Sequence, residues 1–214
     1  MNTNPGIENL SEFDGATMAP ESTIFVNRNL RMDNIKVIGF DMDYTLARYH
    51  RRAIEELAYR LTIEKLLRRG YPSSIADLKY DPDFVIRGLT VDKKLGNIVK
   101  LDRHNHVVRA YHGKVPLTKE QRKKNYRKTR LQFAEPRFLS VDTYFSLPEI
   151  CLLADLVHYF EARGDRSRDP WQLYEDTRDC IDEVHRDDSL KSVIKADLPT
   201  YICLLYTSPS PRDS

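Results

Sequence analysis

Two carboxylates stand two residues apart directly after the first strongly apolar stretch of the chain. Residues 35–40 are rich in β-branched and aromatic side chains, and Asp41 and Asp43 follow them. One carboxylate can attack a phosphorus atom, a second can donate and accept a proton, and both can bind a hard cation. The pair therefore suits phosphoryl transfer, although such residues also commonly cap a turn or a helix.

An apolar run of this kind predicts a strand that is buried on both faces, as in a parallel sheet. In open α/β sheets, ligands bind at the carboxyl ends of the strands. We therefore expect Asp41 and Asp43 to lie at the ligand-binding edge of a sheet in which residues 35–40 form a strand.

A second group of polar side chains recurs at helical spacing later in the chain. Arg178, Asp182 and His185 are four and three residues apart in a predicted helix that begins near Pro170 and continues through His185. Their stripe borders an apolar stripe of Leu173, Tyr174, Ile181 and Val184. The pattern fits the wall of a cleft, and it fits an ordinary surface ion pair with a bystander histidine equally well.

Two further helices are predicted from apolar periodicity and from the residues that end it. Apolar side chains recur every three or four residues over 53–69, and Gly70 ends this helix. Pro148 occupies a position typical of a helix start, and Gly164 ends the apolar run that follows. Both helices contain enough apolar residues to contribute to a core.

Strands and a loop are predicted between these helices. Residues 88–111 alternate short β-prone runs with turns, which predicts a meander of three strands. Its last turn contains His104-Asn105-His106, which we interpret as turn residues rather than as metal ligands. Residues 119–130 are strongly charged and predict a solvated loop, although interleaved tyrosine and arginine can also bind single-stranded nucleic acid.

The overall composition argues against several classes of protein. Among 214 residues, 34 are Lys or Arg and 32 are Asp or Glu, so the net charge is +2 and does not favour nucleic acid or anionic lipid. No apolar run approaches the roughly 18 residues that a membrane span requires. Three cysteines without CxxC spacing are typical of a reduced intracellular protein.

Several motifs occur together in a fixed order between residues 24 and 191. They are IFVNRNL, VIGFDMDYTLARY, LTIEKLLRRGYP, YDPDFVIRGL, LGNIVKLD, TYFSLPE and TRDCIDEVH. In sequence and order, this set resembles the cytosolic purine 5′-nucleotidase family of the haloacid dehalogenase superfamily.

The resemblance implies a role for each matching residue. Asp41 would be the nucleophile that forms an aspartyl-phosphate, and Asp43 the general acid and then the general base. The Asp41 carboxylate and the Asp43 backbone carbonyl would bind Mg²⁺, and Thr45 would support their loop. The implied substrate-binding residues are Phe145, Arg178, Asp182, His185 and Lys191. Ser146 stands where the family has an asparagine, which leaves the preference for inosine and guanosine monophosphates open. The activator-nucleotide site of the family is not recognisable before Phe138.

The expected fold class is α/β, with an incomplete, doubly wound, Rossmann-like haloacid dehalogenase core and an inserted α+β cap. In chain order, we expect a flexible leader (1–23), the first part of the core (24–105), the cap (106–186), a truncated return toward the core (187–203) and a non-native tail (204–214). The later motifs of the family would follow the cap. We therefore expect the full-length protein to be the enzyme and this chain to be an inactive fragment.

The resulting hypothesis is a cytoplasmic, Mg²⁺-dependent phosphoric monoester hydrolase. Its partner would be a purine nucleoside 5′-monophosphate, with no nucleic acid and no membrane, and the full-length form could be a homo-oligomer. Two alternatives stay open: a non-catalytic homologue that binds nucleotide or protein, which the intact Asp41 and Asp43 disfavour, and a phosphatase for another small phosphate ester, which Ser146 favours.

Overall fold

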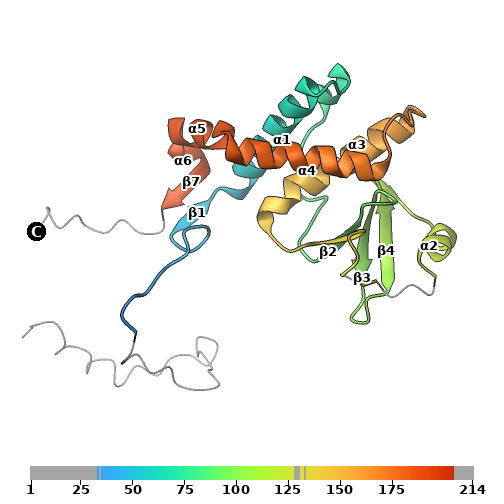
Figure 1. Cartoon of the computed structure of the whole chain (residues 1–214), viewed down its shortest axis with the longest axis horizontal. Coiled ribbons are helices and arrows are strands. Elements are labelled where there is room, and N and C mark those ends of the chain that lie inside the picture. The colour runs from blue at the N-terminus through green and yellow to red at the C-terminus, as the bar shows by residue number, and fades with distance from the viewer. Residues whose placement is uncertain (1–32, 34, 128–130, 133, 205–214) are drawn as a thin grey trace, which may run out of the picture. The chain divides into compact units, whose positions relative to one another are not determined.

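Helix α3 (Leu147–Ala162) lies between a five-stranded sheet and two further helices, α1 (Arg51–Arg68) and α4 (Pro170–Arg186) (Figure 1). The structure, a computed structural model, describes residue 33 and residues 35–127, 131–132 and 134–204. The chain divides into two units, residues 1–39 and residues 40–214. All the helices and strands of the described residues belong to the second unit.

The sheet is antiparallel throughout, with the strand order β5-β4-β3-β2-β6. Its strands are β2 (Leu89–Asp92), β3 (Asn97–Leu101), β4 (Val107–His112), β5 (Val115–Pro116) and β6 (Phe138–Val141). The meander predicted for 88–111 is confirmed as β2, β3 and β4. Asn105 has a left-handed backbone, with φ of 63°, in the β3–β4 turn, where Asp102 accepts the backbone N–H groups of His104 and His106.

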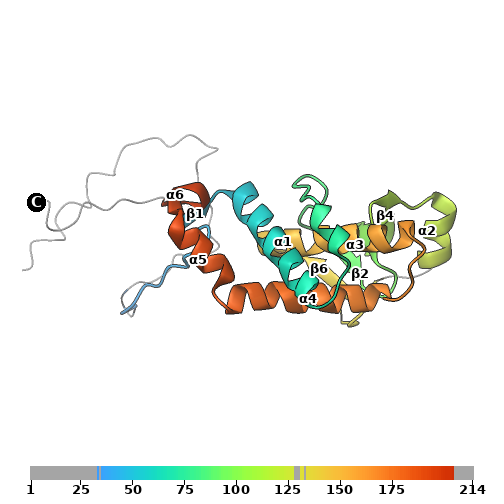
Figure 2. The same cartoon turned by 90° about the horizontal axis from the view of Figure 1, so that it is seen from above.

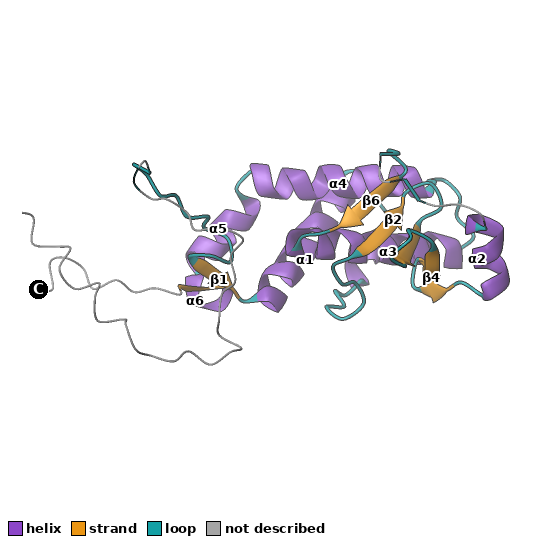
Figure 3. Ribbon diagram, turned by 90° about the horizontal axis from the view of Figure 1, so that it is seen from below, coloured by secondary structure: helices purple, strands orange, loops and turns teal. Residues whose placement is uncertain are grey.

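Successive residues of β3 contribute to two separate cores, because neighbouring side chains of a strand point to opposite faces. Ile98 joins the main core with α1, α3 and α4. Val99 joins a smaller core with Tyr126 of α2 (Lys119–Tyr126) and Phe138. Figure 3 shows the strands on one side of α3.

The predicted helices are confirmed close to their expected bounds. Most residues of α3 are buried, as its apolar sequence requires. α1 contacts both α3 and α4 (Figure 2). The Lys65 ammonium of α1 lies 2.7 Å from a Glu183 carboxylate oxygen of α4 and also binds Asp187.

Short elements complete the second unit. They are β1 (Ala47–Tyr49), the 3₁₀ turns η3 (Ser73–Asp77) and η4 (Tyr144–Ser146), α5 (Ser189–Ala196), α6 (Leu198–Tyr201) and β7 (Ile202–Leu204). β1 and β7 pair in antiparallel register, with Ala47 opposite Leu204. The predicted tail therefore contributes its first residue to a strand, and residues 205–214 lie outside the described residues.

The strand predicted at residues 35–40 is wrong in this structure. These residues have no regular secondary structure, and Val37 and Phe40 are 84% and 69% exposed. A central strand needs neighbours that supply hydrogen bonds and cover its faces. Among the described residues, the strands pair with one another and none pairs with this run.

The loop predicted at 119–130 is also wrong for most of its length. Residues 119–126 form α2, while 128–130 lie outside the described residues. Thr118 starts the helix by accepting the Gln121 backbone N–H, and the Gln121 side chain accepts the Thr118 backbone N–H. This reciprocal capping box stabilises a helix start even where the helix itself is charged.

The α/β class is confirmed, since the described residues form both helices and strands, mixed along the chain. The parallel, doubly wound core stays a prediction, because both sheets of the described residues are antiparallel. The partition into leader, core, cap and tail also stays a prediction. Its boundary at 105/106 falls between β3 and β4, which are neighbours in one sheet.

Candidate active site

The Asp41–Asp43 segment forms a tight loop that is held by its own backbone. The Met42 carbonyl accepts the N–H groups of Leu46 and Ala47, at 3.1 and 2.9 Å. Asp41 is exposed, and its Oδ1 accepts the Met42 N–H at 2.9 Å. The loop therefore presents the Asp41 carboxylate to solvent.

The Asp43 carboxylate has a side-chain partner in the strand that follows the loop. The hydroxyl of Tyr49, in β1, donates a hydrogen bond to Asp43 Oδ1. Burial raises the pKa of the Tyr49 phenol, and the hydrogen bond to Asp43 raises it further, so this hydroxyl keeps its proton at neutral pH. Tyr49 consequently acts as a permanent hydrogen-bond donor to Asp43.

Four rings join this loop to the start of α3. The aromatic cluster consists of Tyr44, Tyr49, Tyr144 and Phe145. The Tyr44 ring centroid lies 5.2 Å from that of Tyr49, 5.3 Å from that of Tyr144 and 6.1 Å from that of Phe145. These separations are typical of edge-on and tilted aromatic pairs. The cluster places the carboxylate loop against η4.

A small cavity extends the aromatic cluster to α4. Tyr44, Phe145, Pro148 and His185 are among the residues that line it, and its volume is about 10 Å³. A space of this size holds at most one water molecule. The structure thus brings together three segments that the sequence singled out separately: the Asp41–Asp43 loop, Phe145 and the polar stripe of α4.

The polar stripe is anchored by a carboxylate from α3. Arg178 Nη1 lies 2.6 Å from Glu149 Oε2, and Arg178 Nε lies 3.6 Å from Asp182 Oδ2. Glu149 is 1% exposed, whereas the side chains of Arg178 and Asp182 are 43% and 48% exposed. The stripe therefore runs from a buried anchor in α3 to the solvent-exposed surface of α4.

His185 is partly buried at the end of this stripe. Burial lowers the pKa of its imidazole, Asp182 opposes that effect, and the positive charges of Arg178 and Lys191 lower the pKa further. The ring is consequently neutral at pH 7 and offers one donor and one acceptor nitrogen.

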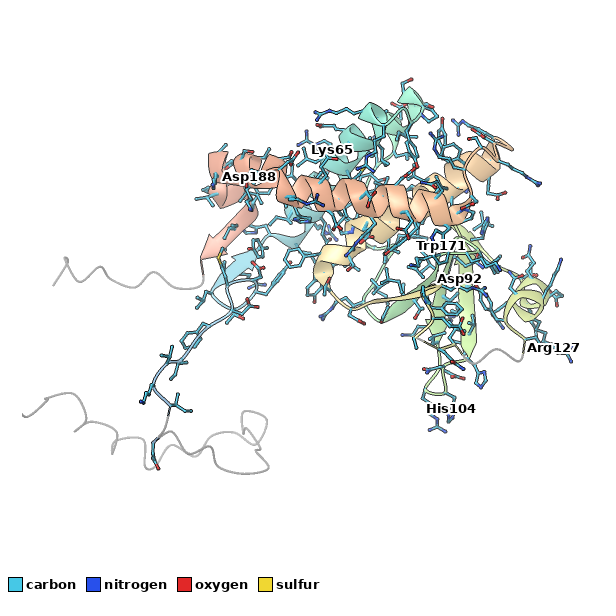
Figure 4. The ribbon with its side chains drawn as sticks, in the orientation of Figure 1. Lys65, Asp92, His104, Arg127, Trp171 and Asp188 are labelled. Carbon is cyan, nitrogen blue, oxygen red and sulfur yellow. The ribbon has the colours of Figure 1, made fainter. Side chains whose placement is uncertain are left out.

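Lys191 and Thr45 lie at the margins of the candidate site. Lys191, in α5, is exposed, and its ammonium pairs with Asp188 at 3.2 Å; Figure 4 shows Asp188 near the junction of α4 and α5. Thr45 is exposed in the carboxylate loop. The backbone bonds to Met42 maintain that loop, so support by the Thr45 side chain stays a prediction.

Asp41 and Asp43 offer hard oxygen donors of the type that Mg²⁺ prefers. The described residues contain no group of three or more His, Cys, Asp or Glu side chains arranged to hold a metal ion. Mg²⁺ usually retains several waters and binds through one or two carboxylates together with substrate phosphate. The exposed Asp41 carboxylate and the Asp43 backbone carbonyl therefore fit part of such a site.

The sequence interpretation missed Glu149 and the three tyrosines of the aromatic cluster. Glu149 did carry a signal, since it is a charged residue within a mostly apolar helix, where a buried acid without a partner is costly. Tyr44 and Tyr49 follow Asp43 closely in sequence, but only the folded structure shows that Tyr49 contacts Asp43 and that Tyr44 contacts Phe145.

Comparison with known proteins identifies the family of this chain. A model of the 5' nucleotidase family matches residues 24–208. The chain is also similar to a 5'-nucleotidase domain-containing protein of Dictyostelium discoideum, with 34% identity over 191 residues. That alignment covers 87% of this chain and 32% of the relative, so the chain spans about a third of the relative's length.

The chain therefore belongs to the 5' nucleotidase family, and the family assigned from its motifs is confirmed. Among the described helices, none is both long enough and apolar enough to cross a membrane.

Proposed function

We propose that the full-length protein is a Mg²⁺-dependent, cytoplasmic 5′-nucleotidase that hydrolyses purine nucleoside 5′-monophosphates through an aspartyl-phosphate. The observation that carries this proposal is the contact between the carboxylate loop and the Phe145 region through the aromatic cluster. A group that handles phosphate and a group that can stack on a base are neighbours there. Family membership supplies the reaction class.

Asp41 is the proposed nucleophile because it is exposed and has one oxygen fixed by the Met42 N–H. In the first step, the other Asp41 oxygen attacks the phosphorus, the bond between phosphorus and the ribose O5′ breaks, and Asp43 donates a proton to O5′. In the second step, Asp43 removes a proton from water, the water oxygen attacks the phosphorus, and the bond to Asp41 breaks. The products are nucleoside and inorganic phosphate.

Asp43 must carry a proton in the first step and lose it in the second. The donor hydroxyl of Tyr49 restricts the Asp43 side chain, which favours one orientation of its carboxyl group toward substrate. The proposed Mg²⁺, bound by Asp41 and Asp43, would neutralise charge on the phosphoryl oxygens.

The base-binding side of the proposed site consists of Phe145, Arg178, Asp182 and His185, with Lys191 toward the phosphate. Phe145 is 38% exposed, so its ring can stack on a purine. Arg178, Asp182 and neutral His185 offer donors and acceptors for the edge of a base or for ribose hydroxyls.

One observation favours a broader substrate range as a second candidate function. Ser146 replaces the family's asparagine, and its hydroxyl pairs with the Thr143 hydroxyl at 2.9 Å. A hydroxyl that is already paired offers less to a purine edge than an amide does. A panel of purine, pyrimidine and non-nucleotide phosphate esters separates the two candidates.

The decisive experiment is Asp41→Asn in the full-length protein, with phosphate release from inosine and guanosine monophosphates as the readout. We expect release to fall to background, because an amide is not a nucleophile in this step. Asp83→Asn is the matched control, since the Asp83 side chain is 84% exposed and lies outside the aromatic cluster. Retained activity in Asp41→Asn, or no turnover by the wild type in the presence of Mg²⁺, would overturn the proposal.

A further inference from the structure

One buried acid is only half paired. Glu149 Oε1 is buried and has no hydrogen-bond partner among the described residues, while Oε2 accepts Arg178 Nη1 at 2.6 Å. An unsatisfied buried oxygen is costly, and an apolar side chain of similar size would avoid that cost. The fold alone therefore does not account for an acid at this position.

The position of Glu149 points to the candidate site instead. It lies in the first turn of α3, one residue after Pro148, which lines the same small cavity as Phe145 and His185. Arg178 lies on α4 seven residues before His185, so both residues occupy one stripe. Glu149 thus contacts the polar stripe of α4 from the start of α3, four residues after Phe145.

The contact also restricts how Arg178 can act. A guanidinium has five N–H donors in a rigid fork, so holding one nitrogen fixes the direction of the others. Glu149 holds Nη1, and Nε lies 3.6 Å from Asp182. No acceptor among the described residues pairs with Nη2. The Arg178 guanidinium is therefore held in one orientation, and its Nη2 group can donate hydrogen bonds to a ligand.

We propose that Glu149 is a positioning residue that orients the Arg178 guanidinium for recognition of the purine base. This inference rests on the proposed nucleotidase function and adds a residue that acts through Arg178 instead of touching the substrate. The unpaired Oε1 gives Glu149 the capacity to accept a second N–H of Arg178 when substrate draws Asp182 away. Such a two-point pair is geometrically stronger than a single contact.

The test uses Glu149→Gln and Glu149→Met in the full-length protein. Glutamine keeps an acceptor and removes the charge, whereas methionine removes both at similar volume. We expect KM for purine monophosphates to rise about tenfold in Glu149→Met, the factor that corresponds to ~1.4 kcal/mol, and less in Glu149→Gln. We expect kcat, and hydrolysis of ribose 5-phosphate, which lacks a base, to stay unchanged.

Asp155→Asn is the matched control for a buried acid on the same helix. Asp155 is 5% exposed and pairs with Lys114 and Tyr59, away from Arg178. We expect this control to leave KM unchanged. A double variant with Arg178→Gln should raise KM no further than Arg178→Gln alone, because Glu149 acts through Arg178.

The possible results distinguish a positioning role of Glu149 from a purely structural role. If the wild type hydrolyses nucleotides but the Glu149 variants leave KM unchanged, the positioning role is wrong and the proposed function stands. If the variants lose nucleotide and ribose 5-phosphate hydrolysis equally, or if neither folds, Glu149 is structural and the inference fails. If the wild type hydrolyses no nucleotide, the proposed function and this inference fail together.

Discussion

The hydrogen bond from Tyr49 to Asp43 predicts a defined kinetic defect. Tyr49→Phe removes one hydroxyl and keeps the ring, whose centroid lies 5.2 Å from that of Tyr44 and 6.2 Å from that of Phe145. The aromatic cluster should therefore stay intact. The loss concerns a single donor to a carboxylate that the proposed reaction uses in both steps.

The expected magnitude follows from the exposure of the pair. A hydrogen bond to a charged group contributes ~1.5–3 kcal/mol when solvent is excluded, and Asp43 is exposed, so we expect about 1 kcal/mol. If this loss appears in the transition state, kcat falls about fivefold and KM does not change. Steady-state phosphate release from a purine monophosphate by the full-length protein measures both constants.

Tyr111→Phe serves as the matched control, because Tyr111 lies in β4, outside the aromatic cluster, and packs against Phe84. We expect it to retain wild-type kcat. The reasoning about Tyr49 is refuted if Tyr49→Phe has the kcat of the wild type, or if only KM changes. The second outcome would assign Tyr49 to substrate binding instead.

Two further predictions concern buried acids. Asp92 is fully buried and accepts two hydrogen bonds from the Arg137 guanidinium, at 2.8 and 2.6 Å. Asp92→Ala should therefore lower the free energy of unfolding, measured by urea denaturation, by about 3 kcal/mol. The control Asp142→Ala, at an exposed position, should change it by less than about 0.5 kcal/mol. Burial raises the pKa of Glu149 above the ordinary value of 4.5 despite the opposing Arg178 charge. A raised pKa in the folded state means that Glu149 favours folding at low pH and that this contribution is lost as pH rises through the folded pKa. Denaturation from pH 4 to pH 8 should therefore show wild-type stability falling relative to Glu149→Gln; a constant difference, or the opposite slope, would contradict this assignment.

Patterns within single elements were predictable from sequence. The stripe of Arg178, Asp182 and His185 beside apolar residues appears in α4 as expected, since helical periodicity depends only on local geometry. The same holds for α1, for α3 and for the three-strand meander. The family was also predictable from sequence, because its motifs and their order can be recognised without knowledge of the fold.

Interactions between distant segments were harder to predict from sequence. The contact of Glu149 with Arg178 joins residues 29 positions apart, and no periodicity indicates it. The prediction of a strand at residues 35–40 was wrong for a related reason. An apolar run forms a buried strand only if other segments of the chain pair with it and cover it. α2 was not predicted, because a strongly charged segment is typical of a loop, although the capping box at Thr118 is a local signal for a helix start.

The two sides of the candidate site should differ in their exchange with solvent. Glu149 lies in a helix whose amides are covered by the main core, so their hydrogen exchange should require opening of the whole unit. Asp41 and Asp43 lie in an exposed loop whose amides can exchange through local opening. Amides of α3 should therefore exchange more slowly than amides of the carboxylate loop, and any adjustment of the proposed site to a phosphate should involve the loop before the helix.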